Sequence, residues 1–145
     1  MQIGIRTAEA GDYSKIYSLI INELGYEHLD YEKLCIRLDR INEDAKQMTV
    51  VAIHDGSVAG FMGINRYTAY NYDGEYLQIV ALAVSKDMQS KGIGTCLTSW
   101  AEEYAIKYKM PAVVLTSRLD RAEAHAFYEH RGYSKVSYGF RKDFH

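Results

Sequence analysis

The chain has 145 residues, 48% apolar and 25% charged, which is typical of a single globular domain over residues 1–145 with a real core. A formal charge of −2 excludes a general basic surface, so we expect no binding to nucleic acid or to an anionic membrane. Two cysteines, Cys35 and Cys96, exclude a disulfide framework, and no stretch of 18 apolar residues occurs, so we expect a soluble, cytoplasmic protein.

The first part of the chain predicts a short strand followed by two helices. Residues 3–5 alternate as in a half-buried strand, and Asp12 is a candidate N-cap for a helix that ends at Gly25. Asp30 is a second candidate cap, for a helix that runs through Ile41. Apolar residues recur at helical spacing in both segments: Ile16, Tyr17, Ile20 and Leu24, then Leu34, Leu38 and Ile41.

The middle of the chain predicts a hairpin and a central strand. Residues 48–54 and 58–67 are extended in pattern, and Asp55-Gly56 between them is a strong two-residue turn signal. A further turn at residues 71–74 leads into residues 76–84, which are nearly all apolar, as in a strand covered on both faces.

The last part predicts alternating helices and strands. After a glycine-containing loop at residues 89–94, a helix is expected over 93–108 and a strand over 112–116. A last helix over 121–130 precedes a final strand over 133–140. The order of these elements predicts an α/β fold class, a layered domain with a mixed sheet.

The loop Gln89–Thr95 lies where a central strand passes into a long helix, so unpaired backbone N–H groups and the positive end of the helix converge there. Glycine at 92 and 94 lets a phosphate approach the backbone, and Lys91 adds positive charge. The alternative is a tight turn that needs glycine only for positive φ. Two other phosphate loops are excluded, because the P-loop spacing is absent and Leu97 stands where the dinucleotide fingerprint needs a third glycine.

These residues resemble the GNAT superfamily of N-acetyltransferases. The signature of that family is a strand ending apolar-x-Val, here Leu82-Ala83-Val84, then Q/R-x-x-G-x-G/A, here Gln89–Gly94. A later helix carries an aromatic pair followed by a Gly-aromatic, here Phe127-Tyr128 and Gly132-Tyr133. Arg121 departs from the Asn often found seven residues before the tyrosine. The resemblance implies a mixed, mostly antiparallel sheet flanked by helices, with acetyl-coenzyme A as co-substrate and no metal.

The resemblance assigns the cofactor to three segments. These comprise Leu82, Ala83 and Val84; Gln89, Ser90, Lys91, Gly92, Ile93, Gly94 and Thr95; and His125 and Tyr128. The backbones of Leu82 and Val84 are expected to pair with the amides of the pantetheine arm, as in strand addition. Their side chains are core residues in either case.

Two residues are candidates for catalysis. A departing thiolate, whose thiol has a pKa of about 8.5, can take a proton or a hydrogen bond from a tyrosine hydroxyl, and Tyr128 is the candidate. The acceptor ammonium must lose a proton, and the central strand lacks the glutamate that the family often places there. Glu75 is the leading substitute, with Asp73 and Gln78 as alternatives, while solvated turn residues remain the simpler reading.

The resemblance implies that two segments select the acceptor: the one between the first two helices and the hairpin before the central strand. Both mix carboxylates with aromatic residues and so favour a cation. The candidate substrate-binding residues are Tyr26, Glu27, Tyr31, Tyr70, Asp73 and Gln78. The sequence thus predicts acetyl transfer to a small primary amine; the alternatives are a protein or peptide amine and a non-catalytic acyl-coenzyme A sensor. Family analogy and a tyrosine-rich edge strand within residues 133–144 lead us to expect a homodimer.

Overall fold

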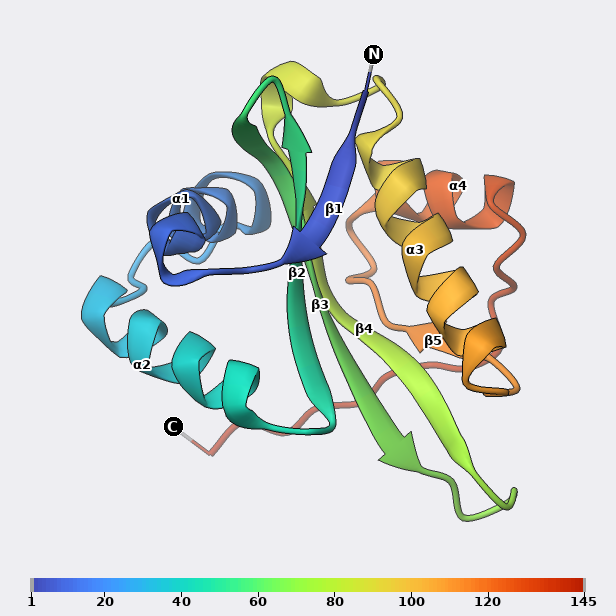
Figure 1. Cartoon of the computed structure of the whole chain (residues 1–145). Helices are drawn as coiled ribbons and strands as arrows, with labels where there is room; N and C mark the ends of the chain where they lie inside the picture. Colours follow the sequence, from blue (N-terminus) through green and yellow to red (C-terminus); the bar gives the residue numbers. More distant parts are fainter. Residues whose placement is uncertain (1, 145) are drawn as a thin grey trace. The chain divides into compact units, whose positions relative to one another are not determined.

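The computed structural model describes residues 2–144 and divides after Val114 into two compact units (Figure 1). The strands are β1 (Gly4–Thr7), β2 (Gln47–His54), β3 (Ser57–Thr68), β4 (Glu75–Val84) and β5 (Val113–Leu115). The helices are α1 (Tyr13–Leu24), α2 (Tyr31–Glu43), α3 (Ile93–Lys107) and α4 (Ala122–His130), with two short 3-10 turns, η1 (Ala10–Asp12) and η2 (Lys86–Met88).

The five strands form one mixed sheet in the order β1-β2-β3-β4-β5, which confirms the predicted α/β fold class. β1, β2, β3 and β4 pair antiparallel with one another in succession. The predicted turn joins β2 to β3, and both of its residues, Asp55 and Gly56, have positive φ, at 50° and 75°. Such φ values at both central residues match the twist of hairpin strands.

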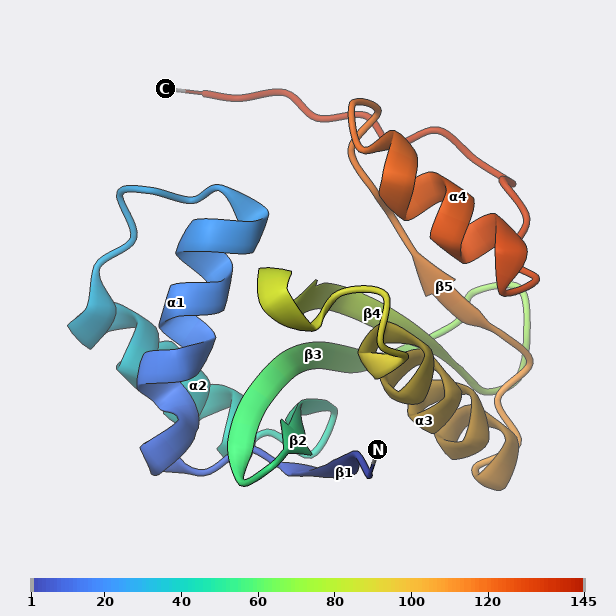
Figure 2. The same cartoon turned by 90° about the horizontal axis from the view of Figure 1, so that it is seen from above.

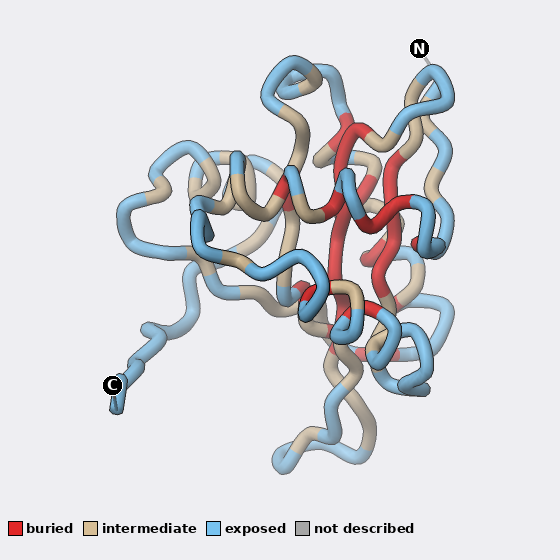
Figure 3. The backbone as a smooth tube through the Cα atoms, turned by 90° about the vertical axis from the view of Figure 1, so that its left-hand side faces the viewer, coloured by how far each residue is buried: buried red, intermediate tan, exposed pale blue. Residues whose placement is uncertain are grey.

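The sheet of the first unit has helices on both faces: α1 and α2 cover one and α3 covers the other (Figures 1 and 2). On the first face, Val51, Phe61 and Ala83 pack in one cluster with Ile16 and Leu38. Buried residues follow the central strands (Figure 3). The sheet core therefore forms the rigid base on which the loops at its ends are held.

α3 approaches the sheet closely because β3 has a glycine beneath it. A Cβ on Gly60 would lie 2.9 Å from the carbonyl oxygen of Ala83 and 3.1 Å from the side chain of Ile93. Ile93 and Leu97, the first apolar residues of α3, are fully buried. This packing fixes the start of α3 against the end of β4.

A β-bulge in β4 changes the face on which its side chains lie. Gly63 pairs with Ala81 and Ile64 with Ile79, so Val80 is the extra residue. Before the bulge, Gln78 lies on the same face as Phe61 and Asn65, the face of α1 and α2. Because of the bulge, Gln78 near the start of β4 lies on the same face of the sheet as Ala83 near its end.

The predicted helix boundaries are largely confirmed. Gly25 ends α1 in the left-handed conformation, and the Asp30 carboxylate accepts from the Lys33 N–H at 2.9 Å as a true N-cap. Asp12 precedes α1 but makes no capping bond there. It instead pairs with Arg6 at 2.7 Å, and this hydrogen bond holds the pKa of the Asp12 carboxyl below its ordinary value.

The strand predicted over residues 133–140 is wrong, since the described chain has no strand after β5. The alternation is present, but Val136, Tyr138 and Phe140 are 83%, 78% and 94% exposed. A strand needs backbone partners along its length. Within the second unit, this segment pairs with no other strand.

Candidate functional site

The end of β4 has backbone groups that do not bond to β3. Val84, Ala83 and Leu82 are opposite Gly60, Phe61 and Met62, and the N–H of Ser85 donates to the carbonyl of Ala59 at 2.8 Å. Bonded and non-bonded pairs alternate in an antiparallel ladder. Ala83 therefore bonds to β3, whereas the N–H and C=O groups of Leu82 and Val84 point toward the other edge of β4.

The predicted glycine loop follows β4 directly and turns into α3. Ser90 and Gly92 both have positive φ, 67° and 88°, and Gly92 is the N-cap of the helix. The first intrahelical bond runs from the Cys96 N–H to the Gly92 carbonyl at 3.0 Å. The N–H groups of residues 93–95 thus have no partner within the helix. They point at the space before α3, where the helix dipole favours an anion.

The residues of the loop contribute in different ways. Ile93 is 1% exposed, so its side chain belongs to the core and only its N–H is available to a ligand. Lys91 is exposed and adds positive charge near the helix start. The loop therefore combines backbone donors with one mobile cation, which is suited to a phosphate group.

Gln89 connects the loop to its surroundings. Its side-chain Nε2 donates to the Val84 carbonyl at 3.2 Å and to the Glu23 carboxylate of α1 at 3.3 Å. The sequence placed Gln89 in the cofactor motif but gave no reason for its partners, because Glu23 is 66 residues away along the chain. Gln89 therefore connects the loop to β4 and to α1.

The second unit contains the other predicted motif on α4. Burial raises the pKa of the Tyr128 phenol, against a smaller lowering by the charge of Arg121. The Tyr128 ring packs edge-on against Phe127 and Tyr133, with centroids 5.4 and 6.0 Å apart. Tyr128 therefore keeps its proton at neutral pH and can donate a hydrogen bond.

His125 is on the same helix and makes a local contact. Its Nε2 lies 2.7 Å from the carbonyl oxygen of Arg118, in the segment before α4. This contact connects α4 to the segment that precedes it. Among the described residues of the second unit, no carboxylate pairs with His125 to activate it as a base.

Glu75 and Gln78, both nominated as sources of a base, lie on opposite faces of β4. Glu75 pairs with Arg66 at 2.9 Å and with Lys46 at 2.6 Å. The hydrogen bond from Lys46, with a further contribution from Arg66, lowers the pKa of Glu75. A carboxylate held by two cations accepts a proton less readily, so the geometry suits Glu75 to positioning more than to proton transfer.

Arg66 is the centre of a group that we term the charged clamp, formed by Lys46, Arg66, Glu75, Tyr104 and Tyr108. The guanidinium of Arg66 donates to the Tyr104 hydroxyl at 3.2 Å and lies over the Tyr108 ring at 5.0 Å. The clamp therefore connects β3 and β4 to the end of α3.

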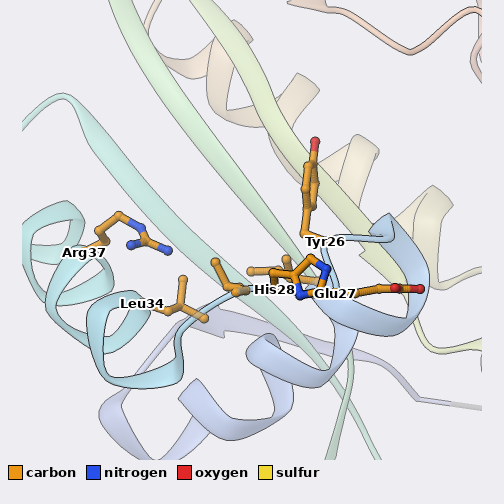
Figure 4. Close-up of a pocket in the computed structure, with 7 residues that line it drawn as sticks. Tyr26, Glu27, His28, Leu34 and Arg37 are labelled. Carbon is orange, nitrogen blue, oxygen red and sulfur yellow. The ribbon is translucent and has the colours of Figure 1, made fainter. Parts of the chain in front are cut away.

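The predicted acceptor residues fall into two groups. Tyr26 and Glu27 line a surface hollow of about 530 Å³ between α1 and α2, together with His28, Leu34 and Arg37 (Figure 4). Arg37 extends into this hollow from α2 and supplies a cation that the sequence analysis had not singled out. Tyr31 is absent from the lining and packs edge-on against Tyr17 at 5.2 Å.

The second group belongs to the β3–β4 hairpin, residues 66–76. Tyr70 is fully exposed at its turn, whereas Tyr67 and Tyr76 form a cross-strand pair with centroids 5.7 Å apart. The acceptor prediction covered this aromatic segment and named Tyr70 in it, but it did not foresee that Tyr67 pairs with Tyr76. The sequence does contain a signal for this pair, because Arg66 precedes Tyr67 and Glu75 precedes Tyr76. In two paired strands this alternation puts the charged side chains on one face and the tyrosine rings on the other.

Within residues 2–144, no cluster of three or more His, Cys, Asp or Glu side chains is arranged to hold a metal ion. None of the helices in the described chain has the length and apolar character needed to cross a membrane.

The fold and the loop together match one class of proteins, the acyltransferases. The sequence profile of the Acetyltransferase (GNAT) family matches residues 13–133. The chain therefore belongs to the GNAT family of acetyltransferases, as the two motifs indicated, and this family uses acetyl-coenzyme A.

Two curated relatives support this membership. The chain is 28% identical over 138 residues to an aminoalkylphosphonate N-acetyltransferase of Salmonella typhimurium, covering 95% of this chain and 89% of the relative. It is 32% identical over 125 residues to the uncharacterized N-acetyltransferase YhdJ of Bacillus subtilis, covering 85% and 86%. A solved structure from Bacillus halodurans, described as a transcriptional regulator, shares the fold with a TM-score of 0.91, at 24% identity and covering 99% and 100%.

Proposed function

We propose that this chain transfers an acetyl group from acetyl-coenzyme A directly to the primary amine of a small cationic molecule. The observation that supports this most strongly is the donor side of the first unit. There the backbone groups of Leu82 and Val84 that do not pair with β3 lead into a loop that presents the N–H groups of residues 93–95. Such a row of donors and acceptors suits a pantetheine arm that ends in a pyrophosphate.

The reaction needs only the two substrates and proton transfer. The amine nitrogen attacks the thioester carbonyl, a C–N bond forms, the C–S bond breaks, and the amine gives up one proton. Tyr128 is proposed to hydrogen-bond the departing sulfur. Because its pKa is raised above that of a thiol, full proton transfer from Tyr128 would be uphill, and hydrogen-bond donation is the more favourable role.

The acceptor is proposed from the two acidic and aromatic segments. The hairpin segment from Tyr67 to Tyr76 contains four tyrosines and two carboxylates, of which Glu75 is already held by Lys46 and Arg66. At neutral pH a primary amine is an ammonium, which tyrosine faces and carboxylates attract. The same segment does not suit an acceptor that is anionic throughout.

A second candidate is an amine that also carries an anionic group. Arg37 and Glu27 both line the hollow, from opposite sides in the view of Figure 4, so together they offer opposite charges to the two ends of a zwitterion. One relative is named for an aminoalkylphosphonate, which is such a molecule. This candidate keeps the reaction and changes only the acceptor.

The first test is a thermal shift with acetyl-coenzyme A. At 100 times its dissociation constant, a ligand that binds only the folded state adds about 2.7 kcal/mol of stability. The absence of any shift would contradict the whole proposal. Release of free thiol with spermidine, an aminoglycoside, 2-aminoethylphosphonate and a lysine peptide then separates an enzyme from a sensor and ranks the acceptor classes.

A further inference from the structure

The two faces of the β3–β4 hairpin carry different kinds of side chain at neighbouring positions: charged groups on one face and tyrosine rings on the other. Arg66 and Glu75 lie on the face of α3, while their immediate neighbours Tyr67 and Tyr76 lie on the opposite face. The salt bridge on one face therefore spans the same stretch of backbone as the tyrosine pair on the other.

The charged clamp holds this stretch firmly. Arg66 donates through both Nε and Nη2 to one oxygen of Glu75, at 3.2 and 2.9 Å, and its Nη1 donates to the Tyr104 hydroxyl. Lys46 occupies the second oxygen of Glu75. The side chains of Arg66 and Glu75 are 24% and 17% exposed, so water screens this network less than a surface pair.

The tyrosine pair faces away from the clamp. Tyr76 contacts two other rings, Tyr67 at 5.7 Å and Tyr72 at 6.4 Å, and Tyr67 and Tyr72 remain partly exposed. Asn65 and Gln78 form the next cross-strand pair on that face. With Glu75 turned to the other side, this face presents aromatic rings and neutral amides.

We propose that Arg66 is a positioning residue whose pairing with Glu75 holds Tyr67 and Tyr76 as a subsite for the ammonium group of the acceptor. The inference rests on the proposed function for the identity of the acceptor as an amine. Tyrosine faces attract a cation through the ring quadrupole, and the attraction depends on how the rings are set. Without the pairing of Arg66 with Glu75, this stretch of β3 and β4 would be held less firmly. The relative orientation of the Tyr67 and Tyr76 rings would then change.

The test is calorimetric titration of spermidine into the protein without acetyl-coenzyme A. We expect Tyr67→Ala to weaken binding about two- to fivefold, the range for an exposed cation–π contact. Arg66→Met should weaken it to a similar degree although it touches no part of the subsite, and Arg66→Lys should restore part of the loss. Tyr138→Ala and Arg40→Met, at exposed positions elsewhere, are the matched controls and should bind as the wild type does.

A second readout separates positioning from a general loss of structure. With spermidine as acceptor, Arg66→Met should raise the KM for spermidine while kcat and the KM for acetyl-coenzyme A stay near wild type. Its thermal shift with acetyl-coenzyme A should also persist. Wild-type affinity for spermidine in either Tyr67→Ala or Arg66→Met, or no spermidine binding by the wild type, would overturn the inference. A missing acetyl-coenzyme A shift would instead count against the proposed function.

Discussion

The loop from Ser85 to Thr95 and the hairpin from Arg66 to Tyr76 flank the same strand, β4, yet they are built on different principles. The loop presents backbone N–H groups, which any sequence with the right turn conformation would present. The hairpin presents side chains, and the surroundings of each depend on the face of the sheet that it occupies. A site made of backbone groups can therefore be recognised from a short sequence motif. A site made of side chains on paired strands can be recognised only once the strand register and the packing are known.

The largest effect is expected from a change at Tyr128, which lies on α4, outside both the loop and the hairpin. This change tests whether acetyl transfer also depends on a residue beyond these two regions. Tyr128→Phe removes the hydroxyl and should lower kcat by about 10²-fold, the order of effect expected when one hydrogen-bond donor to developing negative charge is lost. The KM for acetyl-coenzyme A should stay within about twofold. Steady-state kinetics with Tyr138→Phe as control would check this, and an unchanged kcat would remove Tyr128 from the mechanism.

A change in the loop should affect donor binding and spare the hairpin. Gly94→Val adds bulk where the phosphate must approach the N–H groups, so affinity for acetyl-coenzyme A should fall about 10- to 100-fold, equivalent to one charged hydrogen bond. Spermidine binding should be unchanged. Gly11→Val is the matched control, because a Cβ there meets no atom within 4 Å. If both ligands weaken together, the two regions are not independent.

A change at Glu75 distinguishes positioning from base catalysis within the hairpin. Glu75→Gln removes the charge that Arg66 and Lys46 bind, and as a clamp residue it should raise the acceptor KM about fivefold with kcat kept. A general base would instead cost about 10²–10⁴ in kcat. Measuring kcat and the acceptor KM of Glu75→Gln across pH would decide between the positioning role and the general-base role.

The pH dependence of stability gives an independent check on Glu75. Its pKa is lowered in the folded state, chiefly by the hydrogen bond from Lys46, so its stabilisation is present above the ordinary glutamate pKa. That stabilisation is lost as the pH falls through the folded value. Thermal unfolding of wild type and Glu75→Gln should therefore differ at pH 7 and converge in acid. A constant difference across this range would show that the carboxylate charge is not what stabilises the hairpin.

The smallest effect is expected at Gln89, where the loop is tied to its surroundings. Gln89→Ala removes two long, exposed hydrogen bonds, so acetyl-coenzyme A should bind about threefold less tightly. Glu23→Gln removes only the charge of one partner and should change the affinity less. Titration of acetyl-coenzyme A measures both, and a larger loss at Glu23 would show that α1 rather than the loop sets this contact.

The sequence predicted the elements that depend on local signals. Asp55-Gly56 gave the turn between β2 and β3, Gly25 gave the end of α1, and Asp30 gave the cap of α2, since each is a matter of backbone conformation or a short-range bond. The strand expected at residues 133–140 failed for the opposite reason. Alternation is local, but a strand also needs a partner, which residue order does not supply.

The sequence by itself determined the family, the fold class and the glycine loop before α3, because each is encoded in contiguous residues that specify backbone geometry. Only the tertiary structure decided the role of the polar residues around β4. It turned Glu75 toward Arg66 and Lys46, set Gln78 on the other face, and paired Tyr67 with Tyr76. The physical reason is that a side chain's partners are set by strand register and by the bulge at Val80, and both are properties of the assembled sheet.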